Sequence, residues 1–349
     1  MSEAQEELME GEGEGEEEPE ELSPEVQNQI WIRNLVDTEG IFESPVDINI
    51  TYTREIEVLP LEWNNFEVPP KKIKITNTGH TIIYSAKWGQ ERPHLTNGPF
   101  FGKYVFSNLH LHWGVNDMEG SEHTVDSGRQ PGEMHVVMFK SSYLTQEAAL
   151  KEQDGCATLV YFFKLQEAAN PAFQVIVDAL YDIQKAGTGK KIEPFALTSL
   201  IGIFENDYFL YWGTVSTVSC THYLMWLISR VPIGVSSEQI DVLRYLFDEN
   251  GEQLTRNFRE VQPLNNRTVL HVNPSSSKYA TLLPPKNTFV QIYRCEVIYN
   301  KALRFGNNNS RQDKIILKCS YEDDQEIKKK RNKKHSKWEL GILRYVFDW

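Results

Sequence analysis

Short runs of apolar residues, or of alternating apolar and polar residues, recur between about Ile30 and Asn300, with clusters of Gly, Pro and Asn between them. Alternation with a period of two is typical of half-buried β-strands, and the intervening clusters are typical of turns. The predicted strands are Lys72–Thr76, Thr81–Ser85, Ser107–Trp113, Glu133–Lys140, Ala157–Lys164 and Tyr223–Ser229. The pattern therefore predicts a mainly β domain.

Two stretches are predicted to be helical, Pro171–Lys185 and Ser236–Asn250. In the second stretch Ser236 is followed three residues later by Gln239, which is the spacing of a capping box at a helix N-terminus. Apolar residues then recur at Ile240, Leu243, Leu246 and Phe247, as on one face of a helix. We expect short helices packed on a larger β structure.

The two ends of the chain differ in charge from the region between them. The chain carries a net charge of −13, and residues 1–22 contain eleven Glu and no Lys or Arg, which leaves −2 for the remainder. A segment that is acidic and poor in apolar residues cannot bury a core, so residues 1–27 are predicted to be a disordered acidic tail. The predicted domain spans residues 28–300, and residues 301–349 form a C-terminal extension.

The extension joins a basic run, Lys328–Lys337 with seven Lys or Arg, to the apolar-rich segment Trp338–Trp349. Three interpretations stay open: a solvated run with a short segment packed on the domain, a nuclear localisation signal, or attachment to a membrane surface. Membrane contact is possible but not favoured, because the apolar residues form no single helical stripe.

The sequence also favours a cytoplasmic protein. No run of 18 apolar residues occurs, and the N-terminus lacks the basic and apolar regions of a signal peptide. The four cysteines, Cys156, Cys220, Cys295 and Cys319, are widely spaced without a C-x-x-C pair, which indicates reduced thiols.

Three of the nine histidines are spaced as metal ligands. His110 and His112 are two residues apart in a predicted strand, so both imidazoles project from one face and Leu111 from the other. His135 lies in the next predicted strand, which could place it beside the pair. Three imidazoles with a vacant fourth position are typical of catalytic zinc, although an H-x-H pair alone is a weak signal.

The surrounding motifs resemble the alpha-class carbonic anhydrase family, in particular its cytosolic animal type. The motifs that carry the resemblance are Leu109–Gly114, Gly120–Asp126 and Glu133–Val137 around the histidines, and Ser44–Ile48, Asn77–His80, Val235–Gln239 and Gln262–Arg267 outside them. They span about residues 30–270 in consistent order. The resemblance implies a large, twisted, mostly antiparallel central sheet with short peripheral α-helices.

The resemblance also implies a function: reversible hydration of CO₂ to bicarbonate and a proton, by attack of a zinc-bound hydroxide. It assigns Zn²⁺ to His110, His112 and His135. Glu122 and Ser216 would orient the hydroxide, and His80 would carry the proton to solvent. The other implied site residues are Asn108, Glu133 and Thr217 around the ligands, and Val137, Thr158, Val215 and Trp226 in the CO₂ pocket.

The chain departs from the family pattern at several of these positions. Ser216 stands where the family usually has Thr, Asn108 where Gln is usual, and Thr158 where a small apolar residue is customary. Val218-Ser219 replaces a Pro-Pro pair. The alternative hypothesis is therefore a weakly active or non-catalytic interaction protein that keeps the fold.

The expected partners are CO₂ and bicarbonate. We expect no nucleic-acid partner. We expect a monomer.

Overall fold

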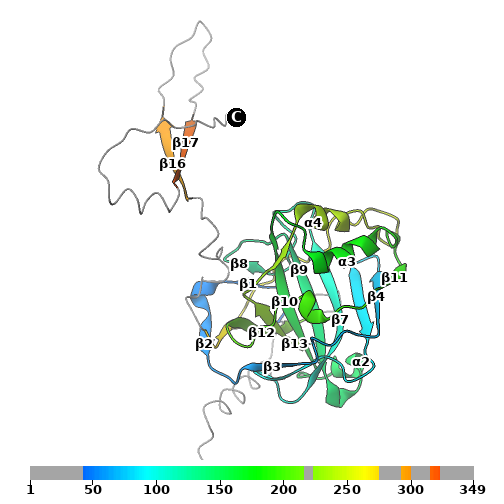
Figure 1. The fold of residues 1–349 in the computed structure, drawn as a ribbon. Coiled ribbons are helices and arrows are strands. Elements are labelled where there is room, and N and C mark those ends of the chain that lie inside the picture. Colours follow the sequence, from blue (N-terminus) through cyan, green and yellow to red (C-terminus); the bar gives the residue numbers. More distant parts are fainter. Residues whose placement is uncertain (1–41, 216–222, 275–291, 300–314, 323–349) are drawn as a thin grey trace, which may run out of the picture. The chain divides into compact units, whose positions relative to one another are not determined.

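The computed structural model describes residues 42–215, 223–274, 292–299 and 315–322 (Figure 1). By contacts between residues the chain divides into two units, Met1–Lys278 and Tyr279–Trp349. The described part of the second unit is an antiparallel pair of strands, β16 (Ile292–Tyr299) and β17 (Ile315–Glu322). The expected acidic tail lies outside the described residues, as does most of the expected C-terminal extension.

The first unit consists mainly of strands. They are β1 (Asp47–Ile48), β2 (Arg54–Ile56), β3 (Leu61–Asn64), β4 (Lys72–Asn77), β5 (Ile82–Lys87), β6 (His94–Asn97), β7 (Tyr104–Trp113), β8 (Thr124–Val125), β9 (Gly132–Lys140), β10 (Cys156–Leu165), β11 (Gly189–Ile192), β12 (Tyr208–Thr214), β13 (Tyr223–Ser229), β14 (Ile233–Val235) and β15 (Leu270–Val272). The helices are α2 (Gln146–Ala149), α3 (Pro171–Leu180) and α4 (Ser237–Leu243), with 3₁₀ turns at Ile50–Tyr52, Ser141–Tyr143 and Leu197–Ser199.

Among the described residues, thirteen strands form one sheet, in the main order β11-β4-β5-β7-β9-β10-β13-β12-β15-β2. β3, β6 and β14 pair beside this path, and β1 and β8 form a separate small sheet. The β10–β13, β10–β14 and β15–β2 pairs are parallel, and the other pairs of the large sheet are antiparallel. This confirms the predicted fold class: a large, mostly antiparallel sheet with short helices.

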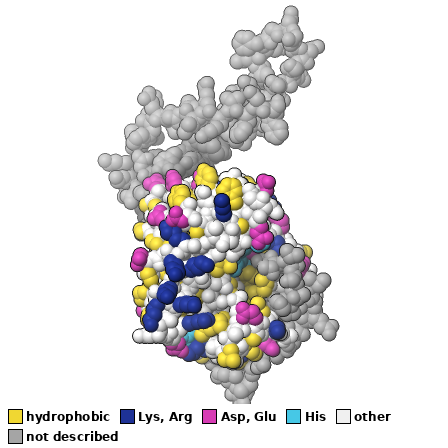
Figure 2. Space-filling view, turned by 90° about the vertical axis from the view of Figure 1, so that its right-hand side faces the viewer, with side chains coloured by type: hydrophobic (Ala, Val, Ile, Leu, Met, Phe, Trp, Pro, Cys, Tyr) yellow, Lys and Arg dark blue, Asp and Glu magenta, His cyan; other side chains and the backbone are white. Residues whose placement is uncertain are grey.

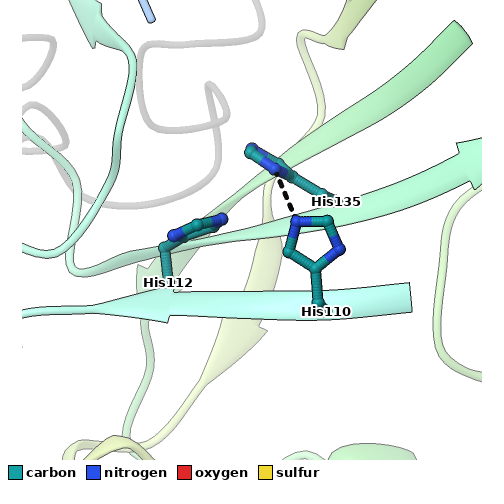
Figure 3. Close-up of side chains that lie close together, drawn as sticks. All are labelled: His110, His112 and His135. Carbon is teal, nitrogen blue, oxygen red and sulfur yellow. Dashed lines mark hydrogen bonds between the residues drawn. The ribbon is translucent and has the colours of Figure 1, made fainter. Parts of the chain in front are cut away.

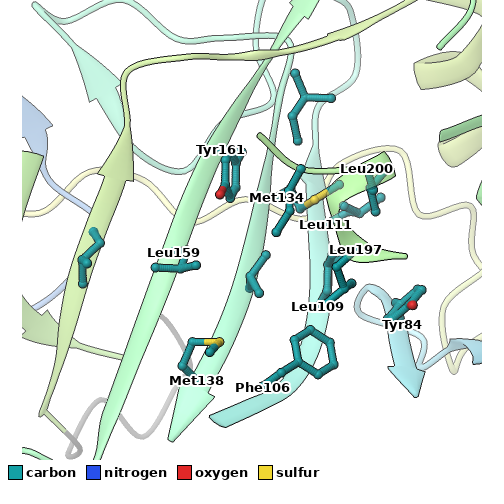
Figure 4. Packing of buried hydrophobic residues seen from close by; sticks show 14 of the residues in the cluster. Tyr84, Phe106, Leu109, Leu111, Met134, Met138, Leu159, Tyr161, Leu197 and Leu200 are labelled. Carbon is teal, nitrogen blue, oxygen red and sulfur yellow. The ribbon is translucent and has the colours of Figure 1, made fainter. Parts of the chain in front are cut away.

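One face of the sheet carries the apolar core. A single row of side chains, each completely buried, crosses seven strands from β5 to β15. The row consists of Tyr84, Leu109, Val136, Leu159, Leu227, Leu210 and Leu270. Helix α3 adds Phe173 and Ile176 to the same cluster, and α4 adds Ile240. Figure 4 shows part of this packing beside β7, β9 and β10.

All six predicted strands are present, but both helices end earlier than predicted. The capping box is confirmed, since the Ser236 side chain accepts from Gln239 N and the Gln239 side chain from Ser236 N. Helix α4 nevertheless ends at Leu243. Leu246 remains buried and Phe247 is half-buried, but Phe247 N donates to the carbonyl of Gln184, so the chain leaves the helix to pair elsewhere. None of the described helices has the length and apolarity to cross a membrane.

Leu159→Ala should lower the free energy of unfolding by about 2–5 kcal/mol, because it leaves a cavity in the centre of the buried row. Urea unfolding of the full chain would measure the loss. Ile203→Ala, at a side chain that is 50% exposed, is the control and should change stability by about 0.5 kcal/mol or less. Equal effects of the two substitutions would contradict the description of the core.

Candidate metal centre

The three candidate ligands stand on two neighbouring strands. Leu109 and Leu111 alternate with His110 and His112 along β7 and are buried in the core. His110 and His112 therefore project from the opposite face of the sheet. His110 is directly opposite His135 in the antiparallel pairing of β7 with β9. The three rings therefore converge (Figure 3), with ring centroids 5.3 Å apart for His110–His112, 5.0 Å for His110–His135 and 4.5 Å for His112–His135.

The ring nitrogens lie close enough to hold one ion. One nitrogen from each histidine falls within 4.8 Å of the other two. Nε2 of His110 is 3.2 Å from Nδ1 of His135. Nε2 of His112 is buried and has no hydrogen-bond partner among the described residues. Because a buried nitrogen without a partner is costly, these three residues fit a bound metal that would use it.

The opposite nitrogens of two rings are held by groups that can only accept a hydrogen bond. Nε2 of His135 faces Oε1 of the buried Glu133, and Nδ1 of His112 lies 3.1 Å from the backbone carbonyl oxygen of Asn257. A carboxylate and a carbonyl require an N–H donor, so these nitrogens carry the proton. The lone pairs of Nδ1 of His135 and Nε2 of His112 are thereby left for the metal.

The charge state of the rings suits a metal centre. Burial lowers the pKa of His110 well below its ordinary value, and the neighbouring His135 and His112 lower it further. Burial also lowers the pKa of His112, partly opposed by Glu122. Both imidazoles are therefore neutral at pH 7, as a ligand must be.

Glu133 also holds the remaining buried histidine of the region. His123 Nδ1 lies 2.7 Å from Oε1 of Glu133, and its backbone N–H donates to Oε2 at 2.8 Å. Nε2 of His123 lies 2.6 Å from the Tyr211 hydroxyl. Both ring nitrogens of His123 are thus occupied. Burial alone would raise the pKa of Glu133, but His123 and His135 hold it well below its usual range.

Glu122 lies next to the histidines and is only 2% exposed. Its Oε1 accepts from the backbone N–H of Arg259 at 3.0 Å and lies 3.4 Å from Nδ1 of His112. Among the described residues its Oε2 has no hydrogen-bond partner. Ser216 and Thr217, which the sequence places with it, lie outside the described residues.

The expected pocket residues form a row across adjacent strands. Val137 on β9 is opposite Thr158 on β10, which is opposite Trp226 on β13. All three are buried, and the Trp226 ring lies 5.1 Å from that of His135. Val215 is half-buried at the end of its described segment. The structure thus brings Val137, Thr158 and Trp226 together beside the histidines.

Asn108 lies in the same row, but its amide is turned to other partners. It donates to Oγ of Ser107 at 3.3 Å and to Oε1 of Gln146 at 3.2 Å. The register of β7 and β9 shifts between Phe106 and Asn108, and the side chain of Asn is one carbon shorter than that of Gln. In this structure Asn108 therefore holds Ser107 and α2, and it has no hydrogen bond to His110.

His80 is exposed at the turn that joins β4 to β5. Thr78 closes this turn, since its backbone N–H donates to the carbonyl of Thr81 at 2.9 Å. The carbonyl of His80 accepts from Nδ2 of Asn257 at 3.0 Å. The residue is thus fixed by its backbone near the strand that carries the ligands, and its ring is left to solvent.

Asn257 is the important residue that the sequence interpretation missed. Besides accepting from His112 and holding His80, it accepts from the Trp113 backbone N–H through Oδ1 at 2.8 Å and donates to the Leu111 carbonyl at 2.9 Å. Its partners are more than 140 residues away in the sequence, so no local pattern could indicate them. It ties β7 to the β4–β5 turn.

The fold and the site together define a β-sheet protein with three imidazoles, on the face opposite the core, that could hold a metal ion. Sequence comparison gives the family: the model for eukaryotic-type carbonic anhydrase matches residues 26–273. This chain therefore belongs to the eukaryotic-type, or alpha, carbonic anhydrase family. The predicted resemblance is confirmed.

Individual relatives agree with this assignment. Carbonic anhydrase 3 of Homo sapiens is 34% identical over 247 residues, which cover 68% of this chain and 92% of the relative. Carbonic anhydrase 3 of Sus scrofa is 34% identical over 238 residues, with 66% and 89% covered. A putative carbonic anhydrase 5 of Caenorhabditis elegans is 28% identical over 230 residues, with 65% and 74% covered.

Asn257→Ala should weaken the site without removing a ligand. It leaves the buried Trp113 N–H without its acceptor, which costs about 1–3 kcal/mol in urea unfolding of the metal-free chain. It should also lower the affinity for Zn²⁺, by roughly 10-fold at most, because the backbone carbonyl that accepts from His112 stays but is no longer held by the side chain; competition with a chelator would measure this.

The matched control is Asn250→Ala, at an exposed residue whose side chain has nearby Asp248 as its partner among the described residues. Its stability and zinc affinity should stay close to those of the unchanged chain. An Asn257→Ala chain that matches this control would show that Asn257 does not support the centre.

Proposed function

We propose that the chain is a zinc enzyme that interconverts CO₂ and bicarbonate. The observation that carries the proposal is the arrangement of the ligand lone pairs. Glu133 and Asn257 fix the tautomers of His135 and His112, so that three ring nitrogens converge on one point. His110, His112 and His135 would hold Zn²⁺, and with only three protein ligands a position is left for a reactant. In carbonic anhydrases zinc lowers the pKa of water to about 7, which supplies a nucleophile at neutral pH.

The protein's own part is first to orient that nucleophile. The Ser216 hydroxyl would donate to Oε2 of Glu122, which is buried and has no partner among the described residues. The oxygen of Ser216 is then left to accept a hydrogen bond from the nucleophile, which fixes the direction of the nucleophile. Glu122 is itself held by the Arg259 backbone N–H. The Glu122 carboxylate would thus fix the Ser216 hydroxyl, and the Ser216 oxygen would restrict the rotation of the nucleophile.

The second part is to bind CO₂ and to export a proton. Val137, Val215 and Trp226 would give CO₂ an apolar wall, which Thr158 makes partly polar. His80 would pass the proton to solvent, because histidine is the side chain whose ordinary pKa lies nearest neutrality. Its exposure at the β4–β5 turn gives buffer access to the ring.

The central test is zinc content together with stopped-flow CO₂ hydration. The purified chain should hold one zinc and hydrate CO₂, whereas His110→Asn and His135→Asn should lose most of both. His94→Asn is the matched control, since His94 is also a buried histidine on a strand but bonds to the Arg92 carbonyl away from the centre. Full zinc without CO₂ hydration in the unchanged chain would favour the alternative, a non-catalytic interaction protein.

Ser216 offers a finer test. Ser216→Thr should raise CO₂ hydration several-fold at most, because the hydroxyl is already present and only its rotamer becomes more restricted, a gain of about 0.5–1 kcal/mol. Ser216→Ala should lower it by roughly 10- to 100-fold, since a hydrogen bond to a charged group contributes about 1.5–3 kcal/mol. Equal rates for all three chains would show that the Ser216–Glu122 contact does not operate.

A further inference from the structure

Four exposed lysines gather on three adjacent strands at one end of the sheet. They are Lys72 and Lys74 on β4, Lys87 on β5 and Lys191 on β11, and we refer to them as the lysine face. Lys72 and Lys74 alternate with the buried Ile73 and Ile75, so their side chains point away from the core. Figure 2 views the molecule from the side on which β4 and β11 lie in Figure 1 and shows Lys and Arg gathered there.

The strand register places these like charges directly opposite each other. Lys72 is paired with Lys87 across β4 and β5, and Lys74 with Lys191 across β4 and β11. Like charges at directly opposite positions destabilise a sheet. Among the described residues none of the four has an ion-pair partner. By contrast, Lys190 points to the other side of β11 and forms an ion pair with Asp182. The acidic residue nearest to β11 along the chain is the exposed Glu193, which directly follows the strand.

Protection of a sheet edge leaves the repulsion within the two lysine pairs without compensation. Lysine on an edge strand discourages pairing with another chain, and β11 is such an edge. The Lys72–Lys87 pair joins β4 and β5, which are interior in the sheet order, and it lies beyond the residues of these strands that pair with β11 and β7. A negative partner over the face would offset the repulsion in both pairs.

We propose that the partner is the acidic N-terminal segment of the same chain, residues 1–22. This segment contains eleven Glu and no Lys or Arg, so its charge is opposite to that of the face and exceeds it in number. Individual exposed ion pairs contribute little, but a run of carboxylates gives each lysine several alternative partners. The contact therefore needs no single fixed pairing.

The length of the connecting chain allows this contact. The first described residue, Phe42, lies at β12, because its carbonyl accepts from the Thr214 backbone N–H. β5 and β4 are five and six strands away from β12 in the sheet order, which corresponds to about 24–29 Å at about 4.8 Å per strand. The 19 residues from Ser23 to Ile41 can extend over about 60 Å. Their connection also keeps the segment at a high effective concentration near the face.

The test is carbodiimide coupling of the full chain, which joins a Glu carboxylate to a Lys amine in direct contact. Trypsin leaves the whole acidic segment in one peptide, residues 1–33, since the first Lys or Arg is Arg33. Mass spectrometry should find this peptide coupled to Lys72, Lys74, Lys87 or Lys191, on the order of fivefold more than to Lys151 or Lys164. Coupling should fall when salt is raised from about 0.02 M to about 0.5 M, because the charges are screened.

Two variants with the same change in charge make the comparison specific. Lys72→Glu/Lys74→Glu should lose most coupling to the remaining lysines of the face, whereas Lys151→Glu/Lys164→Glu should keep it. Zinc content should be equal in both, which would show that both chains are folded. Coupling spread evenly over all exposed lysines would overturn the proposal.

Two further outcomes would also overturn it. If an equal mixture of ¹⁵N-labelled and unlabelled chains gives about half of its coupled peptides between a labelled and an unlabelled chain, the partner is a second copy of the chain. If no coupling is found and the chain sediments with phosphatidylserine vesicles in a way that Lys72→Glu/Lys74→Glu abolishes, the face binds a lipid surface instead.

Discussion

The register between β7, β9 and β10 is the constraint on which the rest of the structure depends. Leu109, Val136 and Leu159 occupy one row that is completely buried, and His110 and His135 occupy the next position along the same strands. Because side chains alternate between the faces of a sheet, a slip of one residue would expose the leucines and bury the imidazoles. The burial of apolar side chains on one face thus holds the metal ligands on the other. No interaction among the histidines themselves is needed to fix their positions.

Some of the buried polar groups around the ligands use only part of their hydrogen-bonding capacity. Both carboxylate oxygens of Glu133 accept hydrogen bonds from His135 and His123, so it acts as a fixed support. By contrast, Nε2 of His112, Oε2 of Glu122 and Nε1 of Trp226 are buried without partners among the described residues. Elsewhere in a protein such atoms are uncommon because each costs stability. Here His112 belongs to the group that could hold an ion, and Glu122 and Trp226 are neighbours of that group, so incomplete pairing leaves atoms available for binding.

The sequence predicted most of the scaffold and much less of the network within it. Period-two alternation is a local property, so all six strands could be predicted, and so could the common face of His110 and His112. The end of α4 could not, since Phe247 leaves the helical pattern for a bond with Gln184, far away in the sequence. Asn257 was missed for the same reason: its role is defined entirely by residues of β7 and by His80. Asn108 shows a third limit, because a family pattern predicts a position but not which neighbours a shorter amide can reach.

The division of the sheet into a core face and a ligand face has a consequence for how such a protein changes over generations. Stability depends on the leucines and aromatic residues of one side, and chemistry on the polar residues of the other, so substitutions on the two sides are largely independent. A lineage can lose a ligand, or exchange Thr for Ser beside the centre, and still inherit an intact scaffold. If selection for catalysis relaxes, the protein therefore still folds and is not degraded. The remaining scaffold can then acquire another function through its surfaces and tails.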